Sequence, residues 1–252
     1  MPGREPTRPL DEHGLLDRAA TLGVKLVQIC DNLPLHTFSS ERFGCFKSRL
    51  AAERVEIECG TRGLTLEQIE VYAGFCRRLG ARLLRFVIDG PNYQPSANEV
   101  SALLSQAVPM LEGLTLGIEN HDRFPAAVLR SIIEGVGSDR IGVCLDTANS
   151  LGAGEGLREV VGELAPVTVN LHIKDFRVDR VPHLMGFNVT GCPAGSGFLN
   201  LPWLLDELRR HGRCKTAVLE QWPAPEIELE ATLEKEEAWA VQSMNFLRPF
   251  FT

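Results

Sequence analysis

The feature that most constrains the fold is a regular alternation of short apolar runs with longer amphipathic stretches. Each apolar run is too short and too uniformly apolar for a surface helix, which is typical of a parallel strand buried on both faces. Seven such strands are expected, at residues 24–30, 54–59, 82–88, 115–119, 141–145, 167–173 and 216–220.

Amphipathic stretches between these runs predict helices. In residues 65–79, Leu66, Ile69 and Cys76 share one face, and Gly80 then ends the helix. The other expected helices are 14–22, 96–112, 124–136, 156–165, 200–211 and 227–247. Strand starts recur about every 26 to 33 residues, one βα unit each, until a glycine-rich segment before residue 216 that we expect to be a long loop.

Consecutive βα units without a linker or a break in composition predict one domain over residues 1–252. A TIM-type (β/α) barrel fits them better than an open doubly wound sheet, which would need a glycine-rich fingerprint where this sequence reads DNLPL. An eighth strand is not evident, because residues 1–13 are polar and contain three prolines, which donate no ladder hydrogen bond. We expect the first strand to be missing and a gap between strands 24–30 and 216–220. The N-terminal segment or a neighbouring chain would cover that gap, unless the natural chain starts upstream of Met1.

Charge and composition exclude several functional classes. With 26 Lys and Arg against 33 Asp and Glu, the net charge is −7, which argues against a nucleic-acid binder. No run approaches the roughly 18 to 20 apolar residues that span a membrane, and the seven cysteines are scattered without a CxxC motif. We expect a cytoplasmic protein with a small-molecule substrate, without nucleic-acid or membrane partners, and leave open whether it forms a homo-oligomer.

An ionisable residue stands at or just past the end of every predicted strand. Active sites of parallel barrels lie where the strands end, so these side chains would meet at one mouth. Any single one could be a helix N-cap, but carboxylates are seldom buried unless they are paired or bind a metal. The set therefore predicts a cation among them. Its members are Asp31, Glu58, Asp89, Glu119, Asp146, His172 and Glu220.

Four of these residues lie in the segments GIENH, CLDTAN, NLHIKD and VLEQW. With the rest of residues 14–248, these segments resemble the xylose-isomerase-like (AP-endonuclease-2-like) TIM-barrel superfamily of sugar phosphate isomerases and epimerases. The resemblance implies one divalent metal held by Glu119, Asp146, His172 and Glu220. Three carboxylates and one imidazole suit Mn²⁺ or Mg²⁺, with Co²⁺ or Zn²⁺ also tolerated.

The sequence departs from the ketose 3-epimerase branch of that superfamily at three positions. Asn149 stands where that branch has a histidine, Pro125 replaces a glutamate, and Arg177 follows the histidine ligand by five residues instead of six. These departures count against epimerisation of a free ketose. Endonuclease IV would need further histidines on the early strands, which are absent from 54–59 and 82–88.

The resemblance implies an isomerase or epimerase that acts on a small sugar, sugar phosphate or keto sugar acid through a metal-bound enediolate. Glu119 and Glu220 would remove and return the proton, and Lys174 would stabilise an oxygen anion. The residues expected to bind substrate are Glu58, His121, Asn149 and Arg177. Two alternatives stay open: a metal-dependent lyase, either a decarboxylase or a dehydratase of a keto sugar acid, and a non-catalytic barrel that binds a metabolite.

Overall fold

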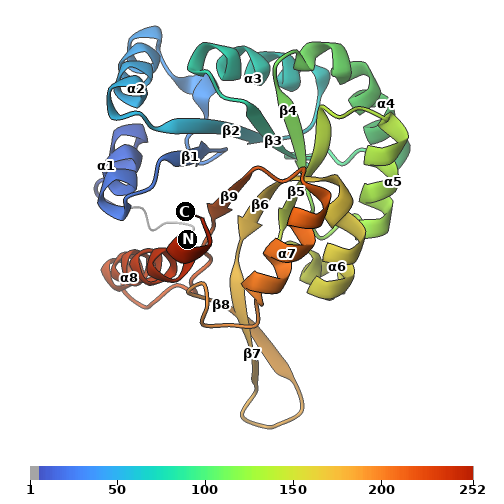
Figure 1. Ribbon diagram of the computed structural model, residues 1–252. Coiled ribbons are helices and arrows are strands. Elements are labelled where there is room, and N and C mark those ends of the chain that lie inside the picture. Colours follow the sequence, from blue (N-terminus) through green and yellow to red (C-terminus); the bar gives the residue numbers. More distant parts are fainter. Residues whose placement is uncertain (1–5, 252) are drawn as a thin grey trace.

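The protein is described by a computed structural model that covers residues 6–251. Seven parallel strands form one sheet in the order β1-β2-β3-β4-β5-β6-β9, which curves into a nearly closed barrel (Figure 1). The strands are β1 (Leu26–Ile29), β2 (Glu56–Arg62), β3 (Leu83–Val87), β4 (Thr115–Glu119), β5 (Ile141–Asp146), β6 (Thr168–Ile173) and β9 (Thr216–Leu219). The expected TIM-type barrel lacking one strand is therefore confirmed.

Helices connect the strands and cover the outside of the barrel (Figure 1). They are α1 (Glu12–Leu22), α2 (Ser40–Glu53), α3 (Leu66–Leu79), α4 (Ala97–Ala107), α5 (Ala126–Val136), α6 (Leu157–Leu164), α7 (Leu201–His211) and α8 (Leu229–Leu247). The helix α2 is an addition to those expected from the sequence. Ser39 caps its N-terminus, and the helix buries Phe43, Phe46 and Leu50 against the barrel.

The core lies between the sheet and this helical layer. All residues of β3, β5 and β6 are buried, as expected of strands covered on both faces. Most of these side chains are apolar, but Arg85 in β3 and Asn170 in β6 are buried polar residues in the middle of their strands. Buried polar groups need partners, so these two positions draw attention to the interior of the barrel.

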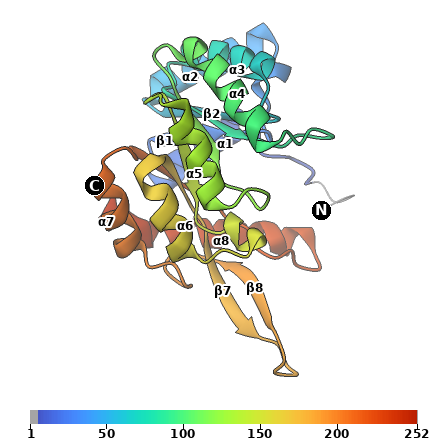
Figure 2. The same ribbon diagram turned by 90° about the vertical axis from the view of Figure 1, so that its right-hand side faces the viewer.

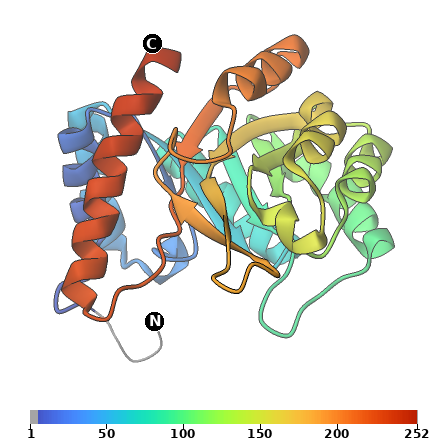
Figure 3. The ribbon, with the colours of Figure 1, turned by 90° about the horizontal axis from the view of Figure 1, so that it is seen from below.

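The barrel is open between β1 and β9, which are not paired in the part of the chain that the structure describes. Residues 6–11 form no strand, and residues 1–5 of the segment proposed to cover the gap lie outside the described residues. The helical layer is continuous across this opening, because α1 and α8 lie side by side (Figures 1 and 3). Arg248 Nη2 donates to the carbonyl of Leu22 at 2.8 Å, and Arg18 pairs with Glu237.

The expected long loop before residue 216 is instead partly a β-hairpin. Strands β7 (Asp175–Arg180) and β8 (Phe187–Cys192) pair antiparallel and project away from the barrel (Figures 1 and 2). The sequence predicted a loop because this segment is rich in glycine, and the two short strands were not recognised. Asp175 holds the base of the hairpin, because its carboxylate accepts hydrogen bonds from the backbone of Gly195, Gly197 and Leu199.

Within residues 6–251, no helix combines the length and the apolar character that a membrane crossing requires.

Candidate metal centre

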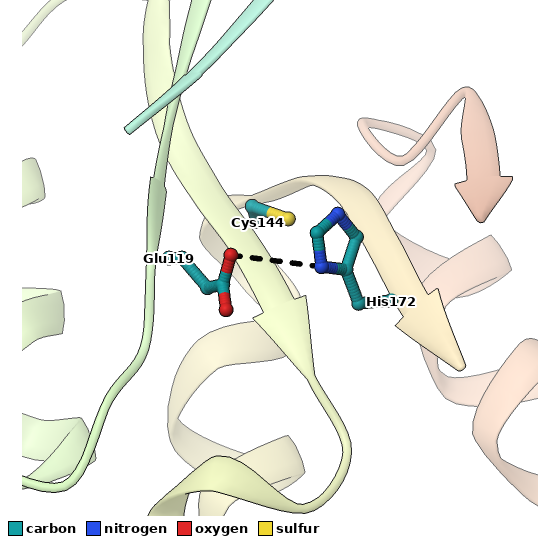
Figure 4. Close-up of side chains that lie close together, drawn as sticks. All are labelled: Glu119, Cys144 and His172. Carbon is teal, nitrogen blue, oxygen red and sulfur yellow. Dashed lines mark ion pairs between the residues drawn. The ribbon is translucent and has the colours of Figure 1, made fainter. Parts of the chain in front are cut away.

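Four side chains meet at the carboxyl ends of the second half of the barrel. Glu119 ends β4, Asp146 ends β5, His172 lies near the end of β6, and Glu220 directly follows β9. One ligand atom from each lies within 4.8 Å of the others. Figure 4 shows the Glu119 carboxylate facing the imidazole of His172, whose Nδ1 lies 3.6 Å from Glu119 Oε2. This geometry matches the ligand set implied by the sequence resemblance.

Three buried atoms of this cluster lack a well-aligned hydrogen bond among the described residues: Asp146 Oδ2, His172 Nδ1 and Glu220 Oε2. His172 Nδ1 and Glu220 Oε2 nevertheless lie only 2.8 Å apart. Buried polar atoms without aligned hydrogen bonds are costly, and carboxylate oxygens with an imidazole nitrogen are ligands of divalent cations. The donor set therefore fits a metal ion held by Glu119, Asp146, His172 and Glu220.

Lys174 lies among the same acidic groups. Its Nζ is 2.9 Å from Asp146 Oδ2 and 3.0 Å from Glu220 Oε1, and it donates to Asn149 Oδ1 at 3.2 Å. Burial works against charge on this amine, but Asp146 and Glu220 outweigh that effect and raise the pKa of Lys174. Burial alone would raise the pKa of Glu220, yet His172 and Lys174 lower it to about 2. The site therefore holds an ammonium next to ionised carboxylate.

The carboxylate of Glu119 has two protein partners. Arg85 is buried inside the barrel, and its Nε donates to Glu119 Oε2. Asn149 Nδ2 donates to Glu119 Oε1 at 2.8 Å. Burial works against charge on Arg85, but Glu119 is among the groups that raise the pKa of the guanidinium. Both oxygens of Glu119 therefore have a donor within the protein, which fixes the orientation of the carboxylate.

A hydrogen-bond network beneath the cluster determines which nitrogen of His172 faces it. Glu58 accepts from Gln28 Nε2 at 3.0 Å, from Asn170 Nδ2 at 3.2 Å and from the Thr216 hydroxyl. Because the amide nitrogen of Gln28 donates to Glu58, its amide oxygen Oε1 faces His172 Nε2, at a distance of 2.8 Å. An amide oxygen only accepts, so Nε2 must carry the proton and Nδ1 is left as the atom that can bind a cation.

Cys144 on β5 also lies beside Glu119 and His172 (Figure 4). Its thiol donates to Asn170 Oδ1 at 3.1 Å. Burial raises the pKa of Cys144 well above its ordinary value, so the group stays a neutral thiol. Metals bind the thiolate, and Cys144 therefore fits this centre less well than Asp146 does.

The four residues expected to bind substrate lie in different places. Asn149 is part of the cluster, and His121 lies at the mouth with its side chain 44% exposed beside Asp122. Arg177 is on the exposed hairpin, where its Nε donates to the carbonyl of Ser196 at 3.0 Å. The structure brings together Asn149 and the metal cluster, but not Arg177.

The expectation that Glu58 ends its strand is wrong. Strand β2 starts at Glu56 and continues to Arg62, so Glu58 lies inside the strand and its carboxylate points into the barrel beneath the mouth. Gly60 and Thr61 interrupt the apolar pattern, but both pair with β3 and are buried. Burial raises the pKa of Glu58, and its partners give it a supporting position instead of a place at the mouth.

Three polar residues of this region were not expected from the sequence: Gln28, which is half-buried, and Arg85 and Asn170, which are buried. Each interrupts an apolar strand, in VKLVQIC, RLLRFVI and VTVNLHI. A polar side chain in the middle of a strand buried on both faces needs an internal partner. That interruption was the signal that could have found them.

Comparisons with known proteins agree with this architecture. Residues 16–250 match the family model described as xylose isomerase-like TIM barrel. A 3-oxo-isoapionate decarboxylase of Pectobacterium atrosepticum is 30% identical over 241 residues, which cover 95% of this chain and 88% of that protein.

Solved structures with low sequence identity share the fold. A xylose isomerase-like TIM barrel protein from Mycobacterium smegmatis, in complex with magnesium, superposes with a TM-score of 0.69 at 17% identity and covers 94% of this chain and 90% of its own. An L-ribulose 3-epimerase gives a TM-score of 0.69 at 17% identity, with 95% and 89% covered. The match of the family model over nearly the whole chain shows that this protein belongs to the xylose isomerase-like TIM barrel family.

Proposed function

We propose that this protein is a metal-dependent decarboxylase of a small keto sugar acid. Isomerisation was the first expectation from the sequence, with a lyase as the alternative. Two findings reverse that order: the similarity to a 3-oxo-isoapionate decarboxylase over most of both chains, and the charges that surround the two glutamates of the cluster.

The observation that carries the proposal is the position of Lys174 between Asp146 and Glu220. Decarboxylation of a keto acid leaves an electron pair on the carbon that loses CO₂, and this carbon must then receive a proton. An ammonium held within 3.0 Å of two members of the metal cluster can supply that proton.

A divalent cation at this centre, Mn²⁺ or Mg²⁺ by its oxygen-rich ligands, would polarise the ketone and stabilise the negative charge that develops on its oxygen. Glu119, Asp146, His172 and Glu220 would hold it. Asn149 orients both neighbours of the reaction site, because its amide donates to Glu119 and accepts from Lys174.

An epimerase would need two proton-transferring groups on opposite faces of the substrate. Glu119 is poorly suited to remove a proton, because Arg85 and Asn149 already donate to its two oxygens. Glu220 alone then remains as a candidate base. This asymmetry favours one proton delivery, as in decarboxylation, over removal and return of a proton.

The test is NMR in D₂O with the Mg²⁺-loaded protein and a panel of keto sugar acids, ketoses and sugar phosphates, with 3-oxo-isoapionate as the first compound. We expect CO₂ release together with one deuterium at the carbon that carried the carboxylate. Deuterium exchange into a ketose without loss of CO₂ would instead establish an isomerase, and loss of water would establish a dehydratase.

Lys174→Met provides the second arm. We expect it to slow CO₂ release by at least about 100-fold, as typical for loss of a positioned general acid. Lys235→Met is the matched control, since Lys235 lies on α8, pairs with Glu226 and is not part of the cluster. Full activity of Lys174→Met would contradict the role of the ammonium.

A further inference from the structure

A small pocket opens beside the metal cluster, at the carboxyl ends of β2, β3 and β4. Its volume is about 170 Å³, and Glu119 forms part of its wall. A cavity of about 150 Å³ holds a molecule of benzene size, so this pocket can hold a few heavy atoms of a substrate that also contacts the cluster. Val87, Ile88, Phe124 and Leu129 supply apolar walls.

Three arginines face this side of the mouth, and their side chains differ in how well they are paired. Arg123 makes hydrogen bonds of 2.5 to 3.0 Å with the carboxylate of Asp89. Arg85 donates to Glu119. Arg62, the last residue of β2, lines the pocket with a side chain that is 46% exposed.

Arg62 is the one of these three arginines whose guanidinium is free to donate hydrogen bonds to a ligand. Its ion pair with Asp31 spans 3.8 Å, and no hydrogen bond of its side chain is present among residues 6–251. Asp31 is shared with Arg85 Nη1, at 3.7 Å. A guanidinium with its donors unoccupied at the wall of an active-site pocket is suited to bind a carboxylate through two parallel hydrogen bonds.

We propose that Arg62 and this pocket bind the carboxylate that the substrate loses. This inference rests on the proposed decarboxylation and deepens it by assigning the two ends of the substrate. The ketone must lie at the metal cluster, where its oxygen gains negative charge. The carboxylate must lie elsewhere, because a carboxylate bound to a dication retains the electron pair that it has to release.

The chemistry balances without a further reactant. The bond between the carboxylate carbon and its neighbouring carbon breaks, and its electron pair passes to that neighbouring carbon and the ketone oxygen. CO₂ leaves, and the proton of Lys174 is added to the same carbon.

Binding of unreactive ligands tests the subsite separately from the reaction. Malate offers a hydroxyl and a carboxylate to a metal ion. One carbon separates its second carboxylate from the hydroxyl-bearing carbon, just as one carbon separates the carboxylate of a β-keto acid from its ketone. In 2-hydroxybutyrate a methyl group replaces that second carboxylate. Calorimetric titration of the Mg²⁺-loaded protein with both enantiomers of each compound would measure the preference.

We expect one enantiomer of malate to bind about 10- to 100-fold more tightly than the matching 2-hydroxybutyrate, as for a charge-assisted hydrogen-bonded pair. Arg62→Gln should abolish this preference and leave 2-hydroxybutyrate binding unchanged. Arg82→Gln, which removes the same charge from an exposed position just before β3 at the other end of the barrel, should keep it. A melting curve confirms that each variant is folded.

Equal binding of the two ligands, or a malate preference that survives in Arg62→Gln, would overturn the subsite. A preference that depends on Arg62, with no CO₂ released from any keto acid, would support the carboxylate subsite and refute decarboxylation. CO₂ release without the preference would support the proposed function and refute this assignment.

Discussion

The two halves of the barrel mouth neutralise their carboxylates in different ways. In the first half, at the ends of β1 and β3, arginines supply the counter-charge. Asp89 is bound by Arg123 through hydrogen bonds of 2.5 to 3.0 Å, and Asp31 lies 3.7 and 3.8 Å from Arg85 and Arg62. These carboxylates are charged strand ends like the others, yet the protein itself pairs them.

In the second half a lysine and a histidine lie beside the carboxylates: Lys174 is 2.9 Å from Asp146 and 3.0 Å from Glu220, and His172 is 2.8 Å from Glu220. Glu119 is satisfied by Arg85 and Asn149, but buried atoms of Asp146, His172 and Glu220 lack aligned hydrogen bonds. The comparison teaches that an acidic residue at a strand end does not by itself predict a metal ligand. The candidate ligands are distinguished by their clustering, because one atom from each of Glu119, Asp146, His172 and Glu220 lies within 4.8 Å of the others.

Removing a ligand from the second half should have the largest effect. We expect His172→Ala to weaken Mn²⁺ binding by more than about 100-fold, since loss of residues that only orient a ligand already costs 10- to 100-fold. Titration calorimetry measures the affinity, and circular dichroism shows whether the metal-free variant is folded. His183→Ala, on the exposed hairpin, is the control. Unchanged Mn²⁺ affinity in His172→Ala would remove the metal centre from this half.

Loss of the support beneath His172 should have a smaller effect. We expect Gln28→Leu to weaken Mn²⁺ binding by about 10- to 100-fold, because Nε2 loses the acceptor that keeps the proton on it and Nδ1 free. Nitrogen NMR of His172 in the Zn²⁺-loaded protein would report the tautomer directly.

The control for this network is Thr216→Val, which removes one donor to Glu58 without contacting His172. It should change Mn²⁺ affinity much less than Gln28→Leu does. If both variants weaken binding equally, the network acts through general packing instead of through the tautomer.

Removing the ammonium of the second half should strengthen metal binding. Lys174 lies within 3.0 Å of oxygens of Asp146 and Glu220, where it competes with and repels a dication. We expect Lys174→Met to bind Mn²⁺ about tenfold more tightly, a change of about 1.4 kcal/mol. Lys174→Arg keeps the charge and should not gain affinity. Weaker binding in both variants would show that the lysine builds the site instead of competing for it.

The smallest effect is expected in the first half. Asp89→Asn should change Mn²⁺ affinity by less than about twofold and the free energy of unfolding by less than about 1 kcal/mol, as for a partly exposed ion pair. Asp146→Asn, measured in parallel by calorimetry and urea unfolding, should lose most of the affinity. If Asp89→Asn and Asp146→Asn lose equal Mn²⁺ affinity, the two halves of the barrel mouth do not differ in metal binding.

Much of the fold could be predicted because it follows from local pattern. Buried parallel strands are short apolar runs, and seven of them alternate with amphipathic helices, so the barrel and its missing strand were expected. The strand ends gave seven ionisable candidates, and the resemblance to the family selected the four that cluster in the structure. Glu58 was misplaced because Gly60 and Thr61 look like a turn, and only pairing with β3 extends the strand to Arg62.

Apart from Glu58, the ionisable side chains at the barrel mouth follow from the sequence, because position along a strand is a local property of the chain. Which charges neutralise each other there depends on the tertiary structure. Arg85 and Arg62 approach Asp31 and Glu119 through the register and curvature of the sheet, and Gln28 meets His172 across 144 residues of sequence. Such contacts depend on the distance between strands that are far apart in the chain, and no local pattern encodes that distance.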